Sequence, residues 1–485
     1  MKKSLLAVAA IGAFASAAQA QSSVTVYGIL DVGYVGSNAS TVNANQGGVA
    51  TVAAPVASNA TINYPNTTGS SATQIMPNGR LSQTQSLFGQ SAVQTSRLGF
   101  KGNEDLGGGV SAFFTAEFGL TPNEQTLSGN TSGGLKNRQT FVGLKKAGWG
   151  DAAIGTQYTP LHIAVGKTDP GQQNNMTGSV IYTGQADSGV LGAYGGNANA
   201  YSSRVSNALT LNSEVMSGIQ AHAMVIANNN NSTAVDKTTA GTVTGGGNNN
   251  MNGWALGLDY TLNKFFITGN YTALKQNNSV ALTGYTADAN IAPSISSTAQ
   301  GNQAGVLNSP QVCNAAGQAG PSGQPSGTAI VANGLSNANQ CLNIQDNQSY
   351  VGATYDFGIL KAYASWISRK ATDTQNNSIY QKRQAEQIGV RSFITPTVEA
   401  WASAGVGTFT PMGYNQNSAH FNAWQLGSNY WLSKRTNIYA IYGQYGQANS
   451  TYATYASGAT TGAAVTTMQT SVNTNSYAVG LRHTF

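Results

Sequence analysis

The most constraining feature of this chain is the alternation of side chains over its last eleven residues, Asn475–Phe485. Apolar and aromatic residues, with His483, fall on one parity; small or polar residues, with Arg482, fall on the other. Because a strand sends successive side chains to opposite faces, the segment predicts a strand with one wet and one apolar face. The apolar row continues to the final residue, whereas free ends usually fray into water. The pattern favours the closing strand of a transmembrane barrel over the last strand of a soluble sandwich.

The other end of the chain has the form of a secretory signal peptide. It begins Met-Lys-Lys, continues with apolar or small residues over 5–15, and reaches an A-x-A cleavage form at 18–20. We expect residues 1–20 to be removed and residues 21–485 to form one barrel domain. Beyond this start, no apolar run approaches the 18 or so residues that a transmembrane helix needs. A membrane-embedded mature chain would therefore cross the bilayer as strands.

The composition fits such a barrel. Charged residues make up 8% of the chain, against roughly 25% in an ordinary soluble domain. A barrel wall needs one apolar residue in two, a polar lumen and uncharged loops. The alternative is a disordered chain or a low-complexity adhesin, and the aromatic residues set in alternating runs disfavour disorder. The net charge of +6, which falls to +4 without the two signal-peptide lysines, is too weak to indicate nucleic-acid binding.

Alternating segments recur along the mature chain and predict sixteen antiparallel strands of about ten residues. The expected strands are 24–34, 90–102, 109–120, 137–146, 152–158, 200–215, 218–228, 252–261, 264–274, 349–356, 359–369, 383–395, 398–408, 421–432, 435–446 and 475–485. Tight turns are expected at one end of the barrel and long polar loops at the other, as in outer-membrane barrels. The longest expected loops are 37–89, 229–251, 276–348 and 447–474.

Cysteine and histidine usage indicates no redox, metal or catalytic chemistry. Cys313 and Cys341 lie in one Gly/Pro/Asn-rich stretch, and we expect them to pair in an oxidising export compartment and to close a surface loop. With no CxxC motif and four scattered histidines, no metal or other cofactor is expected. The chain has no G-x-S-x-G nucleophile motif, so an outer-membrane enzyme is the least favoured functional class.

Four segments resemble the general diffusion porins of Gram-negative bacteria, in particular the beta-proteobacterial type. The matching segments are residues 23–31, 96–109, 137–144 and 479–485. They lie in the expected order. The wall between about 250 and 470 shares the general alternating character of the family without a specific motif. The resemblance implies a sixteen-stranded homotrimeric barrel with long extracellular loops, the third of which folds inward as a constriction. It also implies an outer membrane with its lipid and lipopolysaccharide as surroundings, and small hydrophilic solutes and ions as cargo.

The site of such a protein is a set of charged side chains at the narrowest part of the lumen. The candidate inward loop comprises residues 159–199. Its ionisable residues are Lys167, Asp169 and Asp187. Opposite charges on the two sides of the opening would create a transverse field, so we expect these residues to face basic residues on the wall.

The wall supplies four candidate cations. Arg97 and Lys101 share the lumen parity of their strand, and Arg138 and Arg204 lie near the starts of theirs. Arg138 has the parity of the lipid-facing Val142, so its inward placement requires a local bulge or twist. Further lumen-parity cations are Lys361, Arg383 and Arg391.

Two further expectations concern selectivity and the aromatic residues. The resembling family usually has Gly-Arg-Gln-Tyr where this chain has Gly155–Tyr158 with Thr156 in second place, so one lumen arginine is expected to be missing and anion selectivity to be weak. Aromatic rings at strand ends are expected at the membrane interface, rather than in an inward sugar-binding slide. These are Trp149, Tyr430, Trp431, Tyr477 and Phe485.

Overall fold

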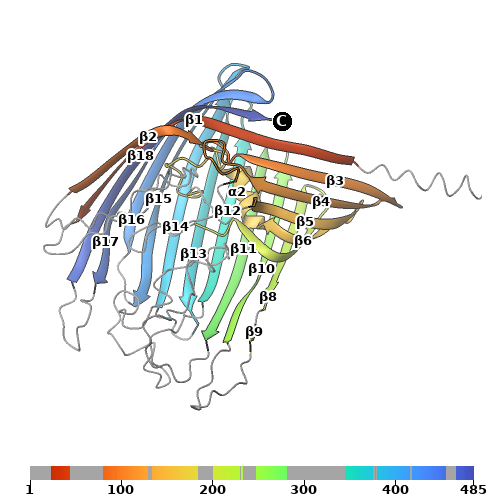
Figure 1. Ribbon diagram of the computed structural model, residues 1–485, viewed down its shortest axis with the longest axis horizontal. Helices are drawn as coiled ribbons and strands as arrows, with labels where there is room; N and C mark the ends of the chain where they lie inside the picture. The colour runs from red at the N-terminus through yellow and green to blue at the C-terminus, as the bar shows by residue number, and fades with distance from the viewer. Residues whose placement is uncertain are drawn as a thin grey trace, which may run out of the picture.

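The computed structural model describes most of the mature chain (Figure 1). The described residues are 23–43, 80–128, 134–183, 200–229, 231–232, 247–280, 344–374, 377, 379–414, 418–454 and 466–485. The expected signal peptide and the expected Cys313–Cys341 disulfide lie outside these ranges. Among the described residues, no helix has the length and apolar character needed to cross a membrane.

The described strands form one antiparallel sheet that closes on itself. They are β1 Ser23–Asn43, β2 Arg80–Gln90, β3 Arg97–Gly107, β4 Val110–Gly119, β5 Lys136–Lys146, β6 Gly150–Tyr158, β7 Arg204–Ser213, β8 Ile219–Asn228, β9 Asn231–Ser232, β10 Gly247–Leu262, β11 Phe265–Val280, β12 Ile344–Asp356, β13 Lys361–Asp373, β14 Ile379–Phe393, β15 Val398–Tyr414, β16 Ala419–Trp431, β17 Thr436–Thr454 and β18 Thr466–Thr484. The two-residue β9 continues β8 against β10, and β2 and β3 share one side of β1. The eighteen strands therefore fill sixteen wall positions, which confirms the predicted sixteen-stranded barrel.

The seam of the barrel joins the first strand to the last. β1 pairs with β18 from Ile29–Thr484 to Asn43–Thr470, and Gly28 and Phe485 exchange backbone hydrogen bonds of 3.1 Å. A Cβ at Gly28 would collide with the Phe485 ring, so glycine is what allows the final aromatic residue to pack against the first strand. Closure leaves the wall without an unpaired edge, which a lipid environment requires.

One wall position is interrupted, and the sequence did not reveal it. Residues 37–89 were expected to form a loop, but β2 pairs with β1 over Val32–Val42. Between β2 and β3, residues 91–96 leave the wall, and the buried Asp31 carboxylate accepts hydrogen bonds from the backbone N–H groups of Val93 and Gln94, both at 2.8 Å. The expectation failed because polar side chains on both parities of β2 give no alternating signal.

Several other strands extend further than expected. β10 and β11 pair as far as Gly247–Val280, and β17 and β18 as far as Thr454–Thr466. Their Asn- and Gly-rich ends lack alternation because both faces of these extensions are polar. The strand register set by the apolar wall nevertheless continues into them, as the long vertical ribbons in Figure 1 illustrate.

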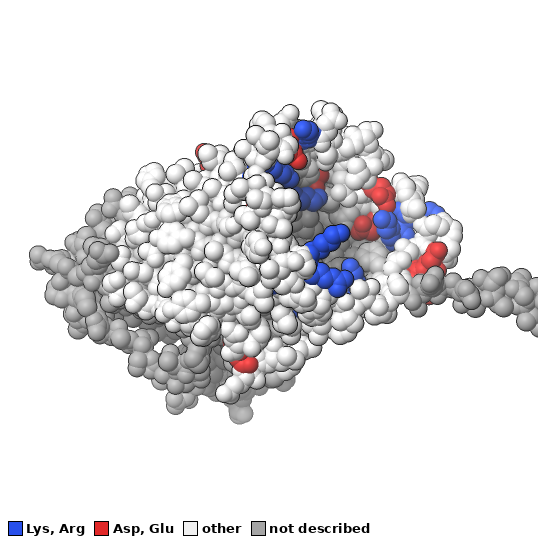
Figure 2. All heavy atoms as spheres, turned by 90° about the horizontal axis from the view of Figure 1, so that it is seen from above, with Lys and Arg blue, Asp and Glu red and all other residues white. Residues whose placement is uncertain are grey.

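The outer face of the wall is apolar and bounded by aromatic rings. Ile154 and Ile388, both more than 60% exposed, belong to its outward rows. Outward aromatic residues pair nearer the ends of the strands that carry the long connections, as in Trp424–Tyr442 with ring centroids 5.3 Å apart. Figure 2 shows a broad flank of the molecule almost free of charged side chains. Such a surface suits contact with lipid acyl chains.

One aromatic expectation is wrong. Trp431 faces the lumen, where its indole N–H donates to Glu399 and its ring lies 5.2 Å from the Arg482 guanidinium. Trp431 ends β16 on the inward parity of the buried Asn429, whereas Tyr430 is exposed on the outward face. Position at a strand end is therefore not enough to place an aromatic ring at the membrane interface. The parity of the residue within its strand determines whether the ring faces the lipid or the lumen.

Candidate functional site

A segment folded inside the barrel begins where β6 ends. The helix α2, Pro160–Thr168, starts at Thr159, whose hydroxyl accepts the backbone N–H of His162 at 3.2 Å as an N-cap. Pro160 occupies the first helical turn, where its missing N–H costs no hydrogen bond. The described part of this inner segment is 159–183, and we call it the inner segment below.

The inner segment crosses the lumen and is attached to four strands on the far side of the barrel. Lys167 Nζ lies 2.6 Å from Asp259 on β10, and the Asp169 carboxylate accepts from Gln387 on β14 at 3.0 Å. The remaining attachments are Asn174 to Gln425 on β16 at 2.6 Å and the Thr177 N–H to Ser476 on β18 at 3.1 Å. The attachments place a fixed polypeptide across the channel axis.

Where the inner segment begins, side chains from β3, β4, β5, β6 and β7 converge. Arg138 Nε donates to Glu117 at 2.8 Å, and Arg97 Nη1 lies 3.8 Å from the same carboxylate oxygen. Arg138 Nη2 also donates to the Tyr158 hydroxyl at 2.7 Å, and the Arg204 guanidinium lies 5.7 Å from the Tyr158 ring. We call Arg97, Glu117, Arg138, Tyr158 and Arg204 the arginine cluster.

A β-bulge turns Arg138 into the lumen. The pairing of β4 with β5 passes from Glu117–Gln139 to Phe118–Asn137, so Arg138 is the extra residue of β5. A bulge interrupts the alternation of side chains and re-aims the one at the bulge. Arg138 is accordingly 5% exposed and in contact with Glu117, although its parity matches that of lipid-facing Val142.

The arginine cluster borders the first turn of α2 and affects the protonation of His162. The ring of His162 lies 4.4 Å from that of Tyr158, and its Nδ1 is 3.1 Å from the Tyr201 hydroxyl. Burial and the neighbouring Arg204, Arg138 and Arg97 hold the pKa of His162 well below its usual range. His162 is therefore a neutral ring at physiological pH, and the positive charge of this region comes from the arginines.

The other predicted site residues lie apart from the arginine cluster. Lys167 is bound to Asp259, and Asp169 is buried against Gln387, where burial raises the pKa of its carboxyl. These two residues therefore attach the inner segment to the far wall, instead of facing Arg97 as expected. Lys101 lies further along β3 with its ammonium 5.5 Å from the Tyr27 ring, and Asp187 falls outside the described residues.

The further lumen-parity cations are also distributed along the far wall. Arg391 binds Glu399 at 2.5 Å and the Pro170 carbonyl at 2.7 Å. Arg383 donates to the Val180 carbonyl at 2.7 Å. Both arginines thus contact the inner segment. Lys361 lies near the short turn after β12, its ammonium 5.4 Å from the Tyr363 ring.

The structure also corrects the expectation at Thr156. Thr156 pairs with Thr140, next to the pair of Ile154 with Val142. Because directly opposed residues in antiparallel strands share a face, Thr156 belongs to the outward row. No lumen arginine is lost there, so this position gives no reason to expect weak anion selectivity.

Sequence reasoning missed the residues that organise the site. Glu117 lies on the inward row of β4, and no sequence pattern connects it with Arg97 and Arg138, which lie 20 and 21 positions away. Gln387 and Gln425 bind the inner segment from 208 and 251 positions away. The available signal was an amide residue on the inward row of a strand, which also describes many solvated lumen positions.

The lumen of the barrel is lined by polar and charged side chains, whereas the outer flank is apolar and almost uncharged. Figure 2 shows Lys, Arg, Asp and Glu side chains gathered around a hollow at one side of the molecule. Within the part of the chain that the structure describes, no group of His, Cys, Asp and Glu side chains could hold a metal ion. The described lumen thus offers charged and polar side chains around a hollow.

Comparisons with known proteins agree with this geometry. Residues 7–451 match the model of the Gram-negative porin family. The chain is 34% identical to an outer membrane porin protein of Bordetella pertussis over 176 residues, which cover 35% of this chain and 37% of that relative. It is 31% identical to outer membrane porin protein 32 of Delftia acidovorans over 160 residues, or 33% of each chain. These alignments span about a third of the length of either relative.

Among solved structures, an anion-selective porin from Comamonas acidovorans superposes with a TM-score of 0.55. The superposition covers 96% of this chain and all of that one at 18% identity. A likeness at this identity concerns the fold: both chains are closed antiparallel barrels.

Proposed function

The chain belongs to the Gram-negative porin family, and from this premise we propose that it forms a water-filled channel through which small hydrophilic solutes and ions diffuse passively. Its place is the outer membrane, which suits a closed barrel with an apolar outer face. The proposal gives the protein a passive role without catalysis. It predicts stable, stepwise conductance from purified protein in a planar bilayer; a protein that inserts without conducting would contradict it.

The single observation that carries the proposal is the inner segment held across a polar lumen beside the arginine cluster. We propose that these two features form the constriction, with Arg97, Arg138 and Arg204 as its cations. Lys167 and Asp169 would then set the width of the opening by fixing the inner segment to β10 and β14. Asp187, from the same connection, remains a sequence-based candidate for the constriction.

We further propose a preference for anions. The arginine cluster has three guanidinium groups and one carboxylate, and a narrow aqueous passage with low-dielectric walls focuses their field and raises the local concentration of counter-ions. The anion-selective porin from Comamonas acidovorans shares the fold, which is consistent with this preference without establishing it. A salt-gradient reversal potential of the sign for chloride permeation is expected. A cation-selective potential would contradict the proposed preference and leave the channel function standing.

The family suggests two properties of the mature protein. We propose that residues 1–20 are cleaved on export and that three copies assemble, each with its own channel. Mass spectrometry of the mature amino terminus should find Gln21 first. Light scattering in detergent should give three times the protomer mass, and bilayer recordings should close in three equal steps.

A further inference from the structure

The interruption of the wall between β2 and β3 lies next to the proposed constriction. We call residues 91–96 the wall turn. The strand ladder beside Asp31 is open there, because the pairing of β1 with β2 starts after this residue and the pairing of β1 with β3 ends before it. The Ser91 N–H donates to the Asp31 carbonyl at 2.8 Å, and the Ser96 hydroxyl accepts the Asp31 N–H at 3.0 Å. The wall turn therefore supplies the hydrogen bonds that a neighbouring strand would otherwise make.

The Asp31 side chain holds the wall turn in place. Asp31 is fully buried, and one carboxylate oxygen accepts the backbone N–H groups of Val93 and Gln94 at 2.8 Å. The other oxygen accepts the hydroxyl of Tyr439 on β17 at 2.6 Å. At the start of the turn, Ser91 has a φ of 63°, a left-handed conformation that residues other than glycine rarely adopt. Such a conformation persists where the surrounding contacts over-determine the backbone.

The wall turn reaches the arginine cluster at its carboxyl end. Arg97 directly follows the turn, and its Nε donates to the Thr95 carbonyl at 2.9 Å. The Nη1 of the same guanidinium lies 3.8 Å from the Glu117 carboxylate. The direction of this long side chain is therefore set by two contacts, and the wall turn supplies the shorter one.

The wall turn also contacts the inner segment. The Asn175 N–H donates to the Ala92 carbonyl at 2.9 Å. The Asn175 side-chain amide donates to the Ser91 carbonyl at 2.7 Å and to the Thr95 hydroxyl at 3.3 Å. Met176 lies in one buried apolar cluster with residues of the turn. The wall turn thus connects the inner segment, which the far wall anchors, to the arginine cluster.

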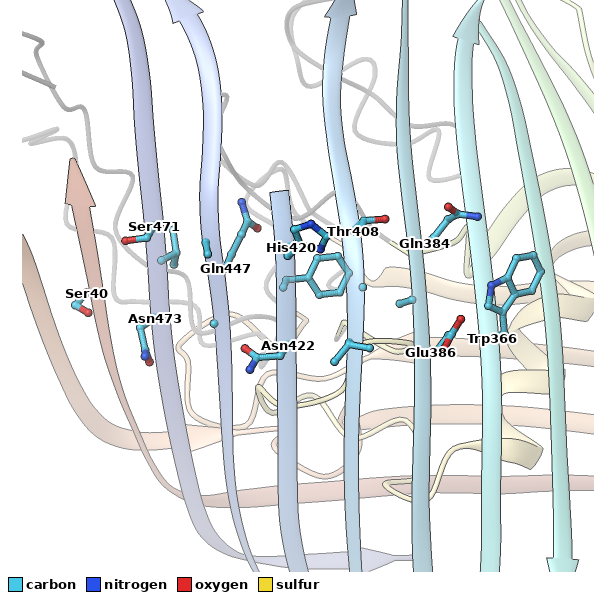
Figure 3. A pocket seen from close by; sticks show the side chains of 17 residues that line it. Ser40, Trp366, Gln384, Glu386, Thr408, His420, Asn422, Gln447, Ser471 and Asn473 are labelled. Carbon is cyan, nitrogen blue, oxygen red and sulfur yellow. The ribbon is translucent and has the colours of Figure 1, made fainter. Parts of the chain in front are cut away.

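The outer face of the barrel does not share this arrangement. A groove of about 760 Å³ on the outer face crosses β13 to β18 and reaches Ser40 on β1 (Figure 3). Ser40 follows Asp31 by nine positions in a strand whose register is continuous, so the two side chains lie on opposite faces. The groove and the wall turn are therefore on different sides of β1, and the wall turn belongs to the lumen.

We propose that Asp31 is a positioning residue of the constriction, which fixes the direction of Arg97 and the place of the inner segment through the wall turn. The inference rests on the proposed channel function. Because Asp31 is fully buried, it acts through the hydrogen bonds that its carboxylate accepts and not by touching a solute. An asparagine would keep one oxygen for the two backbone N–H groups and could donate its amide to the Tyr439 hydroxyl.

The test measures the reversal potential of the purified mature protein in a planar bilayer under a potassium chloride gradient. D31A should lower the chloride-to-potassium permeability ratio about twofold or more, the size of effect that couples residues in contact, and D31N should restore it. In an R97Q background, D31A should change the ratio no further, because the residue through which Asp31 acts is gone. If D31A does not fold, Y439F should give a smaller shift of the same sign that R97Q also abolishes.

The matched control is D105A, which removes an exposed aspartate whose carboxylate accepts the Gly107 N–H at 2.9 Å near the turn between β3 and β4. It should leave the permeability ratio unchanged. A conducting D31A channel with the wild-type ratio would overturn the proposal. So would an equal shift in the R97Q and wild-type backgrounds, or a shift that D31N fails to restore. These outcomes concern channels that conduct; a wild-type protein that inserts without conducting would overturn the channel function and this inference together.

Discussion

The two sides of the lumen carry their charges in different ways. On the far wall, β10 to β18, the ion pairs beside the inner segment join one cation to one carboxylate, as in Lys167–Asp259 at 2.6 Å and Arg391–Glu399 at 2.5 Å. In the arginine cluster, Arg97 and Arg138 share Glu117. Paired charges cancel at a distance and fix structure, whereas shared ones leave a net field. The comparison shows that one wall anchors the inner segment, whereas the other carries the excess of positive charge on which the proposed selectivity rests.

The strongest way to break this comparison is to reverse the charges of the arginine cluster. R97E/R204E should convert the anion preference into a cation preference, a change of roughly tenfold or more in the permeability ratio, because the field at the opening changes sign. The measurement is the reversal potential of single channels in a potassium chloride gradient. K434E, in an exposed turn, is the control and should leave the potential unchanged. An unshifted reversal potential in the double variant would contradict the assignment of both arginines to the constriction.

A pair of isosteric changes sharpens the contrast between the walls. E117Q removes the carboxylate shared by two arginines and should raise the anion preference severalfold. E399Q removes the partner of Arg391 on the far wall and should lower stability by about 3 kcal/mol with little effect on selectivity. Reversal potentials and urea unfolding in lipid vesicles measure the two effects. E104Q, at an exposed position of β3 near its turn to β4, serves as the control. Equal changes of selectivity from E117Q and E399Q would show that the walls do not differ.

Loosening the anchors should have a smaller effect. Gln425 accepts from Asn174 at 2.6 Å and donates to its Oδ1 at 2.9 Å and to the Thr177 carbonyl at 3.1 Å. Each buried hydrogen bond contributes about 1 kcal/mol, so Q425A should weaken one attachment without releasing the inner segment. Open-channel current noise should rise and selectivity should persist. Q444A, on the outward row of the next strand, is the matched control, and quiet currents in Q425A would argue against an anchoring role.

The smallest expected effect is that of acidification on selectivity. Because the pKa of His162 is held well below its usual value, the ring does not protonate in the range around pH 6.5 where a free histidine does, and it adds no charge beside the arginines there. The unfolded chain does protonate this histidine near pH 6.5, so acidification through that range should cost stability. The reversal potential should therefore stay constant over this interval. A titration step near pH 6 that H162N abolishes would contradict the assignment.

Local patterns predicted much of the wall. Tyr477, Val479 and Leu481 are exposed on the outer face, while Ser476 and Ala478 are buried, as the alternation indicated. The lumen parity of Arg97 and Glu117 was equally readable from their strands. The bulge that the inward placement of Arg138 was predicted to require is present in the pairing of β4 with β5. The position of Asp169 was predicted wrongly because the path of the inner segment depends on partners more than 200 positions away.

The sequence by itself determined a closed barrel with an apolar outside, a polar lumen and arginines near one end of several strands, because a period of two is a local property of the backbone. Only the tertiary structure decided that Arg97, Arg138 and Arg204 meet around Tyr158. It also decided that Thr156 faces outward, and that Lys167 and Asp169 attach the inner segment to the far wall. Those outcomes depend on strand register, on one bulge, and on polar contacts across the lumen between residues far apart in the chain. Such contacts form only when the barrel closes.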